Sequence, residues 1–158
     1  MDTARFKALM AHFASGVVVV TARVDDFDHA MTANSFTSVS LEPALVLFCV
    51  QRDSRFHHAV CEASKWVVNI LGADQAPVAQ WFAERGRPLE HQMQVVEHDR
   101  DPDGIAVLRG SLGYLRCTTE AIYPGGDHSI VLGRVAEIVQ SDAAAPPLVF
   151  LDHHLGAL

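Results

Sequence analysis

The segment HAMTANSFTSVSLEP, residues 29–43, separates two of the most hydrophobic runs in the chain. VVVVTARV (17–24) precedes it and ALVLFCV (44–50) follows it. Its three serines, two threonines and single Asn are typical of a solvated turn whose side chains satisfy their own backbone. The same hydroxyls, together with backbone N–H groups, also hold phosphate-bearing cofactors when they converge. Taken alone, the pattern fits both interpretations.

The flanking runs predict β-strands, because they are rich in β-branched residues and bounded by turn residues. The continuous apolar run over 44–51 is expected to be buried on both faces. Further strands are expected at 29–34, at 65–71, at 112–123, at 128–139 and within the tail PPLVFLDHHLGAL (146–158). Six or more strands with two or three helices predict a mainly β fold, a β-barrel with few helices rather than alternating βαβ units.

Helices are predicted at three places. Four apolar residues near the N-terminus fall at i, i+3, i+4 and i+7 of one helix face: Phe6, Leu9, Met10 and Phe13. Gly16 is placed to end that helix. A second helix is expected over 54–64, and Asp74 is placed to cap a third, with Pro77 in its first turn.

The polar, aperiodic segment 84–103 predicts a long loop or lid, and loops of this length are often functional. At its end, DRDPDG (99–104) is similar to the opening of a calcium-binding EF-hand loop. However, the twelfth position of such a loop would be Gly110 instead of a bidentate Glu. An acidic turn is therefore the expected structure.

Length and composition predict one globular domain over residues 1–158, with 49% hydrophobic and 20% charged residues. The apolar runs are far shorter than the roughly 20 residues that a membrane span needs, and no signal peptide is recognisable. Three unclustered cysteines favour the reducing cytoplasm. The net charge of -7 argues against nucleic-acid binding, which requires a basic face.

The sequence lacks the common catalytic and phosphate-binding motifs GxGxxG after a strand, GxxxxGK[ST] and GxSxG. Nine histidines show no metal-ligand spacing, so no metal site is expected. Two features remain as candidates for a ligand site. One is the opening segment together with QRDSRFH (51–57), where Arg52 or Arg55 adds positive charge. The other is GGDHS (125–129), where a His follows two glycines at a strand boundary.

Five segments resemble the short-chain flavin reductases, the flavin reductase-like proteins of the FMN-binding split-barrel fold. They are FASGVVVVTA (13–22), MTANSFTSVSLEPALVLFCVQRDSR (31–55), WVVNILGADQ (66–75), WFAERG (81–86) and GDHSIVLGRV (126–135). This family includes reductase components of two-component flavin-dependent monooxygenases. The resemblance covers roughly residues 5–151 and implies a Greek-key-like split barrel that forms a homodimer, with FMN or FAD bound near the subunit interface.

The resemblance also implies which residues bind the cofactor. Those expected to line the flavin, or to follow along it, are Thr32, Ala33, Asn34, Ser35, Ser38, Val39 and Ser40. Cys49, Gln51 and Ser54 are expected to contribute from the next strand and turn, with phosphate contacts there. Phe82 and Arg85 are expected to close over the flavin, and His128 to contact the nicotinamide nucleotide, NADH or NADPH.

The expected reaction needs no catalytic acid or nucleophile, because hydride transfer from nicotinamide to flavin requires only that two rings be held face to face. Reduced flavin is expected to reach a partner monooxygenase by diffusion. The alternative is a flavin carrier with little or no turnover. It stays open because the tail FLDHHLGAL replaces the YHRGRY-like end of many relatives. His153 and His154 substitute only partly for its cation, since a typical His is mostly neutral at pH 7.

Overall fold

The computed structural model describes residues 1–142 and 145–157. Its helices are α1 (Thr3–Ala11), α2 (Arg55–Glu62), the short 3-10 helix η1 (Ala73–Gln75) and α3 (Ala76–Ala83). Its strands are β1 (Ser15–Gly16), β2 (Val18–Val24), β3 (Phe27–Ala33), β4 (Thr37–Leu41), β5 (Ala44–Gln51), β6 (Lys65–Ile70), β7 (His98–Arg100), β8 (Ala106–Leu108), β9 (Gly113–Gly125), β10 (His128–Gln140), β11 (Val149–Leu151) and β12 (His154–Gly156).

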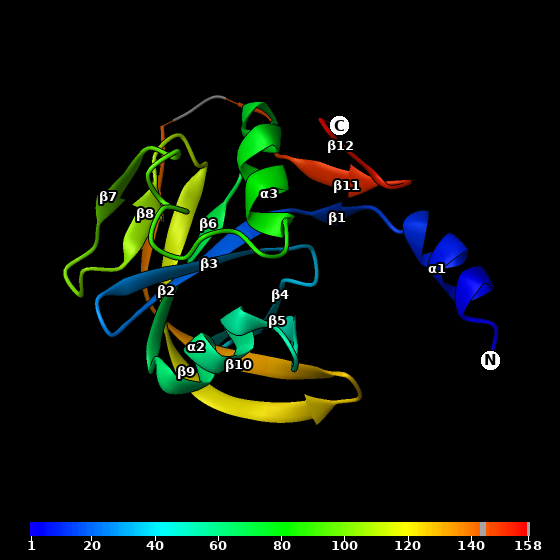
Figure 1. Cartoon of the computed structure of the whole chain (residues 1–158), viewed down its shortest axis with the longest axis horizontal. Coiled ribbons are helices and arrows are strands. Elements are labelled where there is room, and N and C mark those ends of the chain that lie inside the picture. Colours follow the sequence, from blue (N-terminus) through cyan, green and yellow to red (C-terminus); the bar gives the residue numbers. More distant parts are fainter. Residues whose placement is uncertain (143–144, 158) are drawn as a thin grey trace.

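Seven antiparallel strands form one curved sheet in the order β3-β2-β6-β9-β10-β5-β4 (Figure 1). Its two edge strands, β3 and β4, are consecutive in the sequence and are joined by residues 34–36. β3 also approaches β5, so the sheet wraps around its core but stays open beside β3. The mainly β barrel predicted from the sequence is confirmed, and its opening lies at the segment 29–43.

The core inside the curved sheet is built from valines of β2 and β5 around two large aromatic side chains. Phe48 and Trp66 are fully buried, with ring centroids 5.1 Å apart in an edge-to-face arrangement. Side chains of β5 alternate between buried and half-buried, so the expectation of burial on both faces was wrong for this strand. β5 lies beside the edge strand β4, whose own side chains are mostly exposed.

A second core lies under α3, where Ala79 and Phe82 pack against residues of β2, β3 and the segment after the helix. The predicted loop 84–103 supplies Met93 and Val96 to this core before the chain enters β7. α2 begins directly after Ser54, whose hydroxyl accepts a hydrogen bond from the His57 N–H at 3.1 Å. Both helices therefore start or end beside the open edge of the barrel.

Two predicted boundaries were wrong. α1 ends at Ala11 rather than at Gly16, because Gly16 pairs with Val149 of β11 in a three-stranded sheet with β12. Asp74 does not cap α3; it lies in η1, which precedes the helix, although Pro77 does occupy the first turn. The tail forms two short strands, β11 and β12, where one was expected.

Gly133 of β10 is packed against the Trp66 ring. A Cβ atom added at Gly133 would overlap the six-membered ring of Trp66, whose indole N–H donates to Thr119 Oγ1 at 3.0 Å. The ring is therefore held on one side by this hydrogen bond and on the other by Phe48, and it has little room to move. Because Gly133 has no side chain, β10 can pair with β5 here while the Trp66 ring packs directly against its backbone.

We predict that Gly133→Ala lowers the free energy of unfolding by about 1–3 kcal/mol, the usual cost of overpacking a core. Urea unfolding followed by tryptophan fluorescence measures the change. Gly16→Ala is the matched control, because nothing lies within 4 Å of a Cβ atom there. Equal unfolding midpoints for the two variants would contradict the packing described for Trp66.

Candidate functional site

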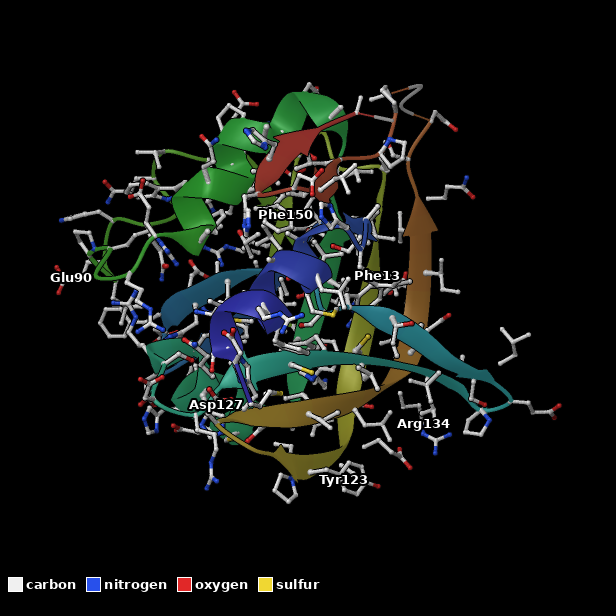
Figure 2. All side chains as sticks on the ribbon, turned by 90° about the vertical axis from the view of Figure 1, so that its right-hand side faces the viewer. Phe13, Glu90, Tyr123, Asp127, Arg134 and Phe150 are labelled. Carbon is white, nitrogen blue, oxygen red and sulfur yellow. The ribbon has the colours of Figure 1, made fainter. Side chains whose placement is uncertain are left out.

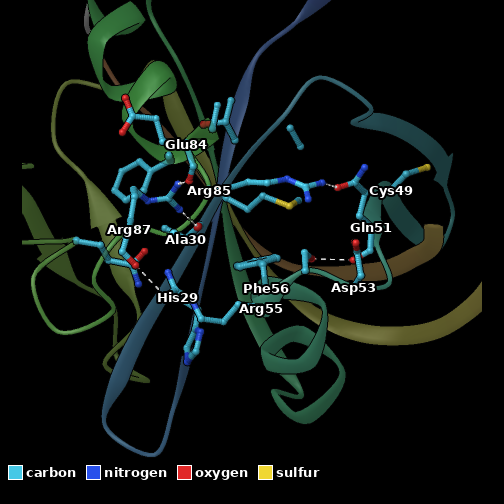
Figure 3. A pocket seen from close by; sticks show the side chains of 18 of the residues that line it. His29, Ala30, Cys49, Gln51, Asp53, Arg55, Phe56, Glu84, Arg85 and Arg87 are labelled. Carbon is cyan, nitrogen blue, oxygen red and sulfur yellow. Dashed lines mark hydrogen bonds between the residues drawn. The ribbon is translucent and has the colours of Figure 1, made fainter. Parts of the chain in front are cut away.

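A pocket with a volume of about 550 Å³ opens where the barrel is split (Figure 3). Its walls come from β3, the link to β4, the end of β5, the start of α2 and the segment that follows α3. The hydrophobic cores lie behind these walls. The segment that interrupts the two apolar runs of the sequence therefore forms one side of the pocket.

Ten of the predicted site residues line this pocket. They are Thr32, Ala33, Asn34, Ser35, Cys49, Gln51, Ser54, Phe82, Arg85 and His128. They come from stretches that are far apart in the sequence and that the barrel brings together. The structure thus joins the segment 29–43, the turn after β5, the end of α3 and the GDHS segment in one cavity.

Five other predicted residues do not line it. Ser38, Val39 and Ser40 lie on the edge strand β4, at a bulge in its pairing with β5, and Val39 is 48% exposed. His153 and His154 lie in the β11–β12 hairpin beside β1 (Figure 1). Their assignments to the flavin and to the nicotinamide nucleotide stay predictions.

Most hydroxyl groups of the pocket wall are bound to the backbone. Ser35 Oγ accepts from the Cys49 N–H at 3.0 Å and lies 3.3 Å from the Cys49 carbonyl oxygen, to which it donates. Thr32 Oγ1 donates to the Ala79 carbonyl of α3 at 2.7 Å. Ser54 Oγ donates to the Gln51 carbonyl at 2.7 Å. These side chains hold the walls together where the strand ladder is interrupted.

Asn34 differs from its neighbours. Its side chain is exposed and forms no hydrogen bond within the part of the chain that the structure describes. An amide offers both a donor and an acceptor. Within residues 32–35, the TANS motif, Asn34 is therefore the side chain that is free to contact a ligand.

Strand register brings the GDHS segment to the same rim. His128 of β10 lies directly opposite Gln51 of β5, and Arg85 donates a hydrogen bond to Gln51 Oε1. His128 Nδ1 lies 2.8 Å from the Asp127 carboxylate, and this hydrogen bond lowers the pKa of Asp127. An imidazole, an amide and a guanidinium from three elements thus meet at one end of the pocket.

Sequence reasoning missed the groups at the other end of the pocket. His29, Arg87 and Gln92 line the pocket there, together with Arg55, which the sequence indicated only as local positive charge. In Figure 3, His29, Arg55 and Arg87 lie on one side and Cys49 and Gln51 on the other. Arg87 and Gln92 belong to an aperiodic polar segment, so nothing in their spacing distinguished them from solvated residues.

Burial and like charge shape this end of the pocket. Burial, followed by the charge of Arg55, lowers the pKa of His29, and Asp28 opposes the shift. Burial and then Arg55 also lower the pKa of Arg87, against the carboxylate of Glu84. Arg87 is only 8% exposed, and its guanidinium lies 5.5 Å from the centroid of the Phe82 ring.

The orphaned polar atoms of the described residues test whether the pocket suits a polar cofactor. Four buried side-chain nitrogen or oxygen atoms have no hydrogen-bond partner there. Three of them, His29 Nδ1, Arg87 Nε and Gln92 Oε1, belong to residues that line the pocket. Unsatisfied buried groups are costly and are rare without a function. These residues fit a flavin nucleotide, which carries both hydroxyls and phosphate.

No cluster of three or more His, Cys, Asp or Glu suited to a metal ion occurs among residues 1–142 and 145–157. In DRDPDG, Asp101 accepts from the N–H groups of Asp103 and Ile105, which makes the predicted acidic turn. Within the same described ranges, no helix has the length and apolar character needed to cross a membrane.

Comparison with known proteins gives the family. The reductase component of 4-hydroxyphenylacetate 3-monooxygenase from Thermus thermophilus is 40% identical over 149 residues, 92% of this chain and 89% of the relative. The NADH:FAD oxidoreductase SgcE6 of Streptomyces globisporus, solved with NAD and FAD fragments, superposes with a TM-score of 0.92 at 32% identity, covering 99% and 93% of the two chains. BorF, the flavin reductase component of a bacterial two-component tryptophan halogenase, gives 0.92 at 38% identity, covering 99% and 98%. The family model "Flavin reductase like domain" matches residues 10–158, and the chain belongs to this family.

Proposed function

We propose that the protein is an NAD(P)H:flavin oxidoreductase, which reduces FMN or FAD and supplies the reduced flavin to a partner monooxygenase. The observation that carries the proposal is the convergence of the TANS motif, Gln51, Arg85 and His128 on one pocket. Relatives described as reductase components of a monooxygenase and of a halogenase support the partner class.

The chemistry comes from the bound groups: a flavin accepts a hydride from a reduced nicotinamide held against its ring. The residues of the pocket need only bind and orient the two. Asn34 and Arg85 line the pocket, and their amide and guanidinium would supply hydrogen-bond donors to a flavin that gains negative charge on reduction. His128, on the rim opposite Gln51, is placed to contact the nicotinamide nucleotide. No side chain acts as an acid, a base or a nucleophile.

The exposed rim of the pocket is compatible with dissociation of the reduced flavin. Asn34 and Arg85 are exposed, and no glycine-rich phosphate loop encloses the cavity. A ligand that is held mainly from one side dissociates more readily than one that is enclosed. This openness supports release of reduced flavin by diffusion.

The turnover test mixes the protein with NADH or NADPH and with FMN, FAD or riboflavin, and follows the near-ultraviolet absorbance of the nicotinamide. We predict oxidation with at least one pairing. Asn34→Ala should raise KM for flavin about five- to tenfold, since one hydrogen bond contributes about 1 kcal/mol. His128→Ala should raise KM for the nicotinamide nucleotide by a similar factor.

His91→Ala is the matched control, because His91 is exposed and does not line the pocket. Flavin binding without oxidation in any pairing would replace the reductase proposal by a flavin carrier. Equal losses of flavin affinity in Asn34→Ala and His128→Ala would show that His128 has been assigned to the wrong ligand.

We further propose that the protein forms a homodimer through α1 and neighbouring apolar residues. α1 stands clear of the sheets in Figure 1, and Figure 2 shows its side chains on the outside of the molecule. Apolar residues of α1 and of the segment after it are unusually exposed, with Leu9 at 71% and Phe13 at 70%. On β4, Leu41 is 94% exposed. A second copy of the chain would bury these side chains, and burial of apolar area is the main driving force for stable association.

Sedimentation equilibrium tests the dimer at micromolar concentration. We predict a dimer for the wild type and a monomer for Leu9→Glu, which places a charge on the apolar face. Lys7→Glu introduces the same side chain on the same helix and should remain dimeric. A monomeric wild type would contradict this interface.

We place this activity in the cytoplasm and in a single domain that spans the chain. All three cysteines have free thiols, as a reducing compartment favours. The cytoplasm also holds the nicotinamide nucleotides that the reaction consumes. Matching of the family model from residue 10 to residue 158 supports one domain.

A further inference from the structure

The residues on both sides of His128 are tied to α2 and to the turn that leads into it. On the N-terminal side, the Asp127 carbonyl accepts a hydrogen bond from the Arg52 N–H at 3.1 Å. On the C-terminal side, Ser129 Oγ lies 2.9 Å from His57 Nε2, within hydrogen-bond distance. The start of β10 is therefore held at two points, and His128 lies between them.

Side chains alternate across β10, and this separates the role of Ser129 from that of His128. Neighbouring residues of a strand point to opposite faces of the sheet. His128 lines the pocket, whereas Ser129 is buried and shares its face with Val131 of the core. A buried hydroxyl needs a partner, and within the described part of the chain the His57 imidazole is the one that Ser129 Oγ has.

The His57 ring is itself held in place by its neighbours on α2. Cys61 Sγ, one helical turn later, lies 3.9 Å from His57 Nδ1. The His58 ring packs against it edge to face, with centroids 5.8 Å apart. Burial, and then the charges of His58 and Arg52, lower the pKa of His57. Its imidazole is therefore mostly neutral at pH 7, and Nε2 can pair with a hydroxyl in either tautomer.

The same turn of α2 also lines the pocket. Ser54 and Arg55 are pocket residues, and His57 follows two residues later without lining the cavity. One helical turn thus contacts the cavity through its first residues and β10 through His57. The contact between His57 and Ser129 therefore fixes the position of one wall relative to the other.

The turn that precedes His128 has little packing of its own. Gly126 has a φ of +73°, and nothing lies within 4 Å of a Cβ atom there. The Asp127 side chain is 90% exposed. The position of the His128 backbone therefore depends on the strand ladder and on the two contacts with the α2 segment.

We propose that His57 is a positioning residue of the reaction. Its hydrogen bond to Ser129 fixes the start of β10 against α2 and thereby orients the His128 imidazole toward the nicotinamide nucleotide. The inference rests on the proposed function and deepens it, because it names a residue outside the pocket that determines how well the second substrate binds. His57 acts through Ser129 and does not touch either ligand.

Steady-state kinetics with the pairing of nucleotide and flavin that the wild type uses tests the proposal. His57→Ala and Ser129→Ala should each raise KM for the nicotinamide nucleotide about three- to fivefold, the factor that one hydrogen bond contributes. The kcat, and the Kd for flavin from flavin fluorescence, should stay within about twofold of the wild type. A general distortion of α2 would weaken flavin binding as well, since the start of the helix lines the pocket. His57→Gln, whose amide reaches the position of Nε2, should restore most of the wild-type KM.

Double variants test whether His57 acts through Ser129 and His128. His57→Ala combined with Ser129→Ala should raise KM no further than either change alone, because both remove the same hydrogen bond. His57→Ala added to His128→Ala should have no effect beyond that of His128→Ala. His58→Ala is the matched control, because it removes an exposed imidazole from the same turn and keeps the bond to Ser129; it should behave as the wild type does.

Hydrogen–deuterium exchange of the ligand-free protein gives a readout that does not depend on turnover. The peptide that contains residues 127–129 should exchange faster in His57→Ala than in the wild type, because the start of β10 opens more often without its second contact. His58→Ala should exchange at the wild-type rate.

An active wild type with unchanged KM and exchange in His57→Ala would overturn the positioning role and leave the reductase proposal standing. Additive losses in the double variants would overturn the route through Ser129 and His128. A wild type that oxidises no nicotinamide nucleotide would overturn the proposed function and this role with it. If His57→Ala fails to fold, Ser129→Ala removes the same bond and decides.

Discussion

The hydrogen bonds between Ser35 and the backbone of Cys49 hold the two sides of the split barrel together. The ladder between β4 and β5 begins with Thr37 opposite Leu47, so on this side of β5 no strand of the described residues pairs with Cys49. The Ser35 hydroxyl takes the place of such a strand by bonding both the N–H and the carbonyl of Cys49. The sheet can therefore stop without leaving buried backbone groups unpaired, and the space beside β3 becomes a pocket instead of core.

Short polar side chains also hold the other parts of the pocket wall together. Thr32 ties α3 to β3, and Ser54 ties the start of α2 to the end of β5. The Ser54 hydroxyl lies where β5 ends and α2 begins, and the Thr32 hydroxyl joins the interior of α3 to β3. The interpretation of the opening segment as residues that satisfy the backbone is confirmed for Ser35 and Thr32, and the same residues line the pocket; that the pocket holds a ligand stays a prediction.

The two ends of the pocket differ in their polar and charged groups. At one end, Gln51, Arg85 and His128 offer uncharged and charged donors on an exposed rim. At the other end, Arg55 offers an exposed and Arg87 a buried positive charge, and His29 and Arg87 each have one unsatisfied buried atom. A ligand with a flat, weakly charged head and an anionic tail matches this gradient, and a flavin nucleotide has that form.

The strands and the TANS and GDHS segments were predictable because each is a continuous local pattern. The end of α1 was not, because Gly16 pairs with Val149, a residue from the far end of the chain. Arg87 and Gln92 were missed for a similar reason, since their roles depend on how an aperiodic segment folds back onto β3. Ser38, which the family resemblance assigned to the flavin together with Ser35, lies on the edge strand outside the pocket, and its contact with the flavin stays a prediction. Long-range contacts thus decided each difference.

The orientation of the flavin is the central claim, and a crystal structure of the protein with FMN tests it most directly. The account predicts the phosphate within hydrogen-bond distance of Arg55 and His29, and the ring beside Gln51 and His128. A flavin bound along β4 at Ser38 and Ser40, with Arg55 and Arg87 away from its phosphate, would contradict it.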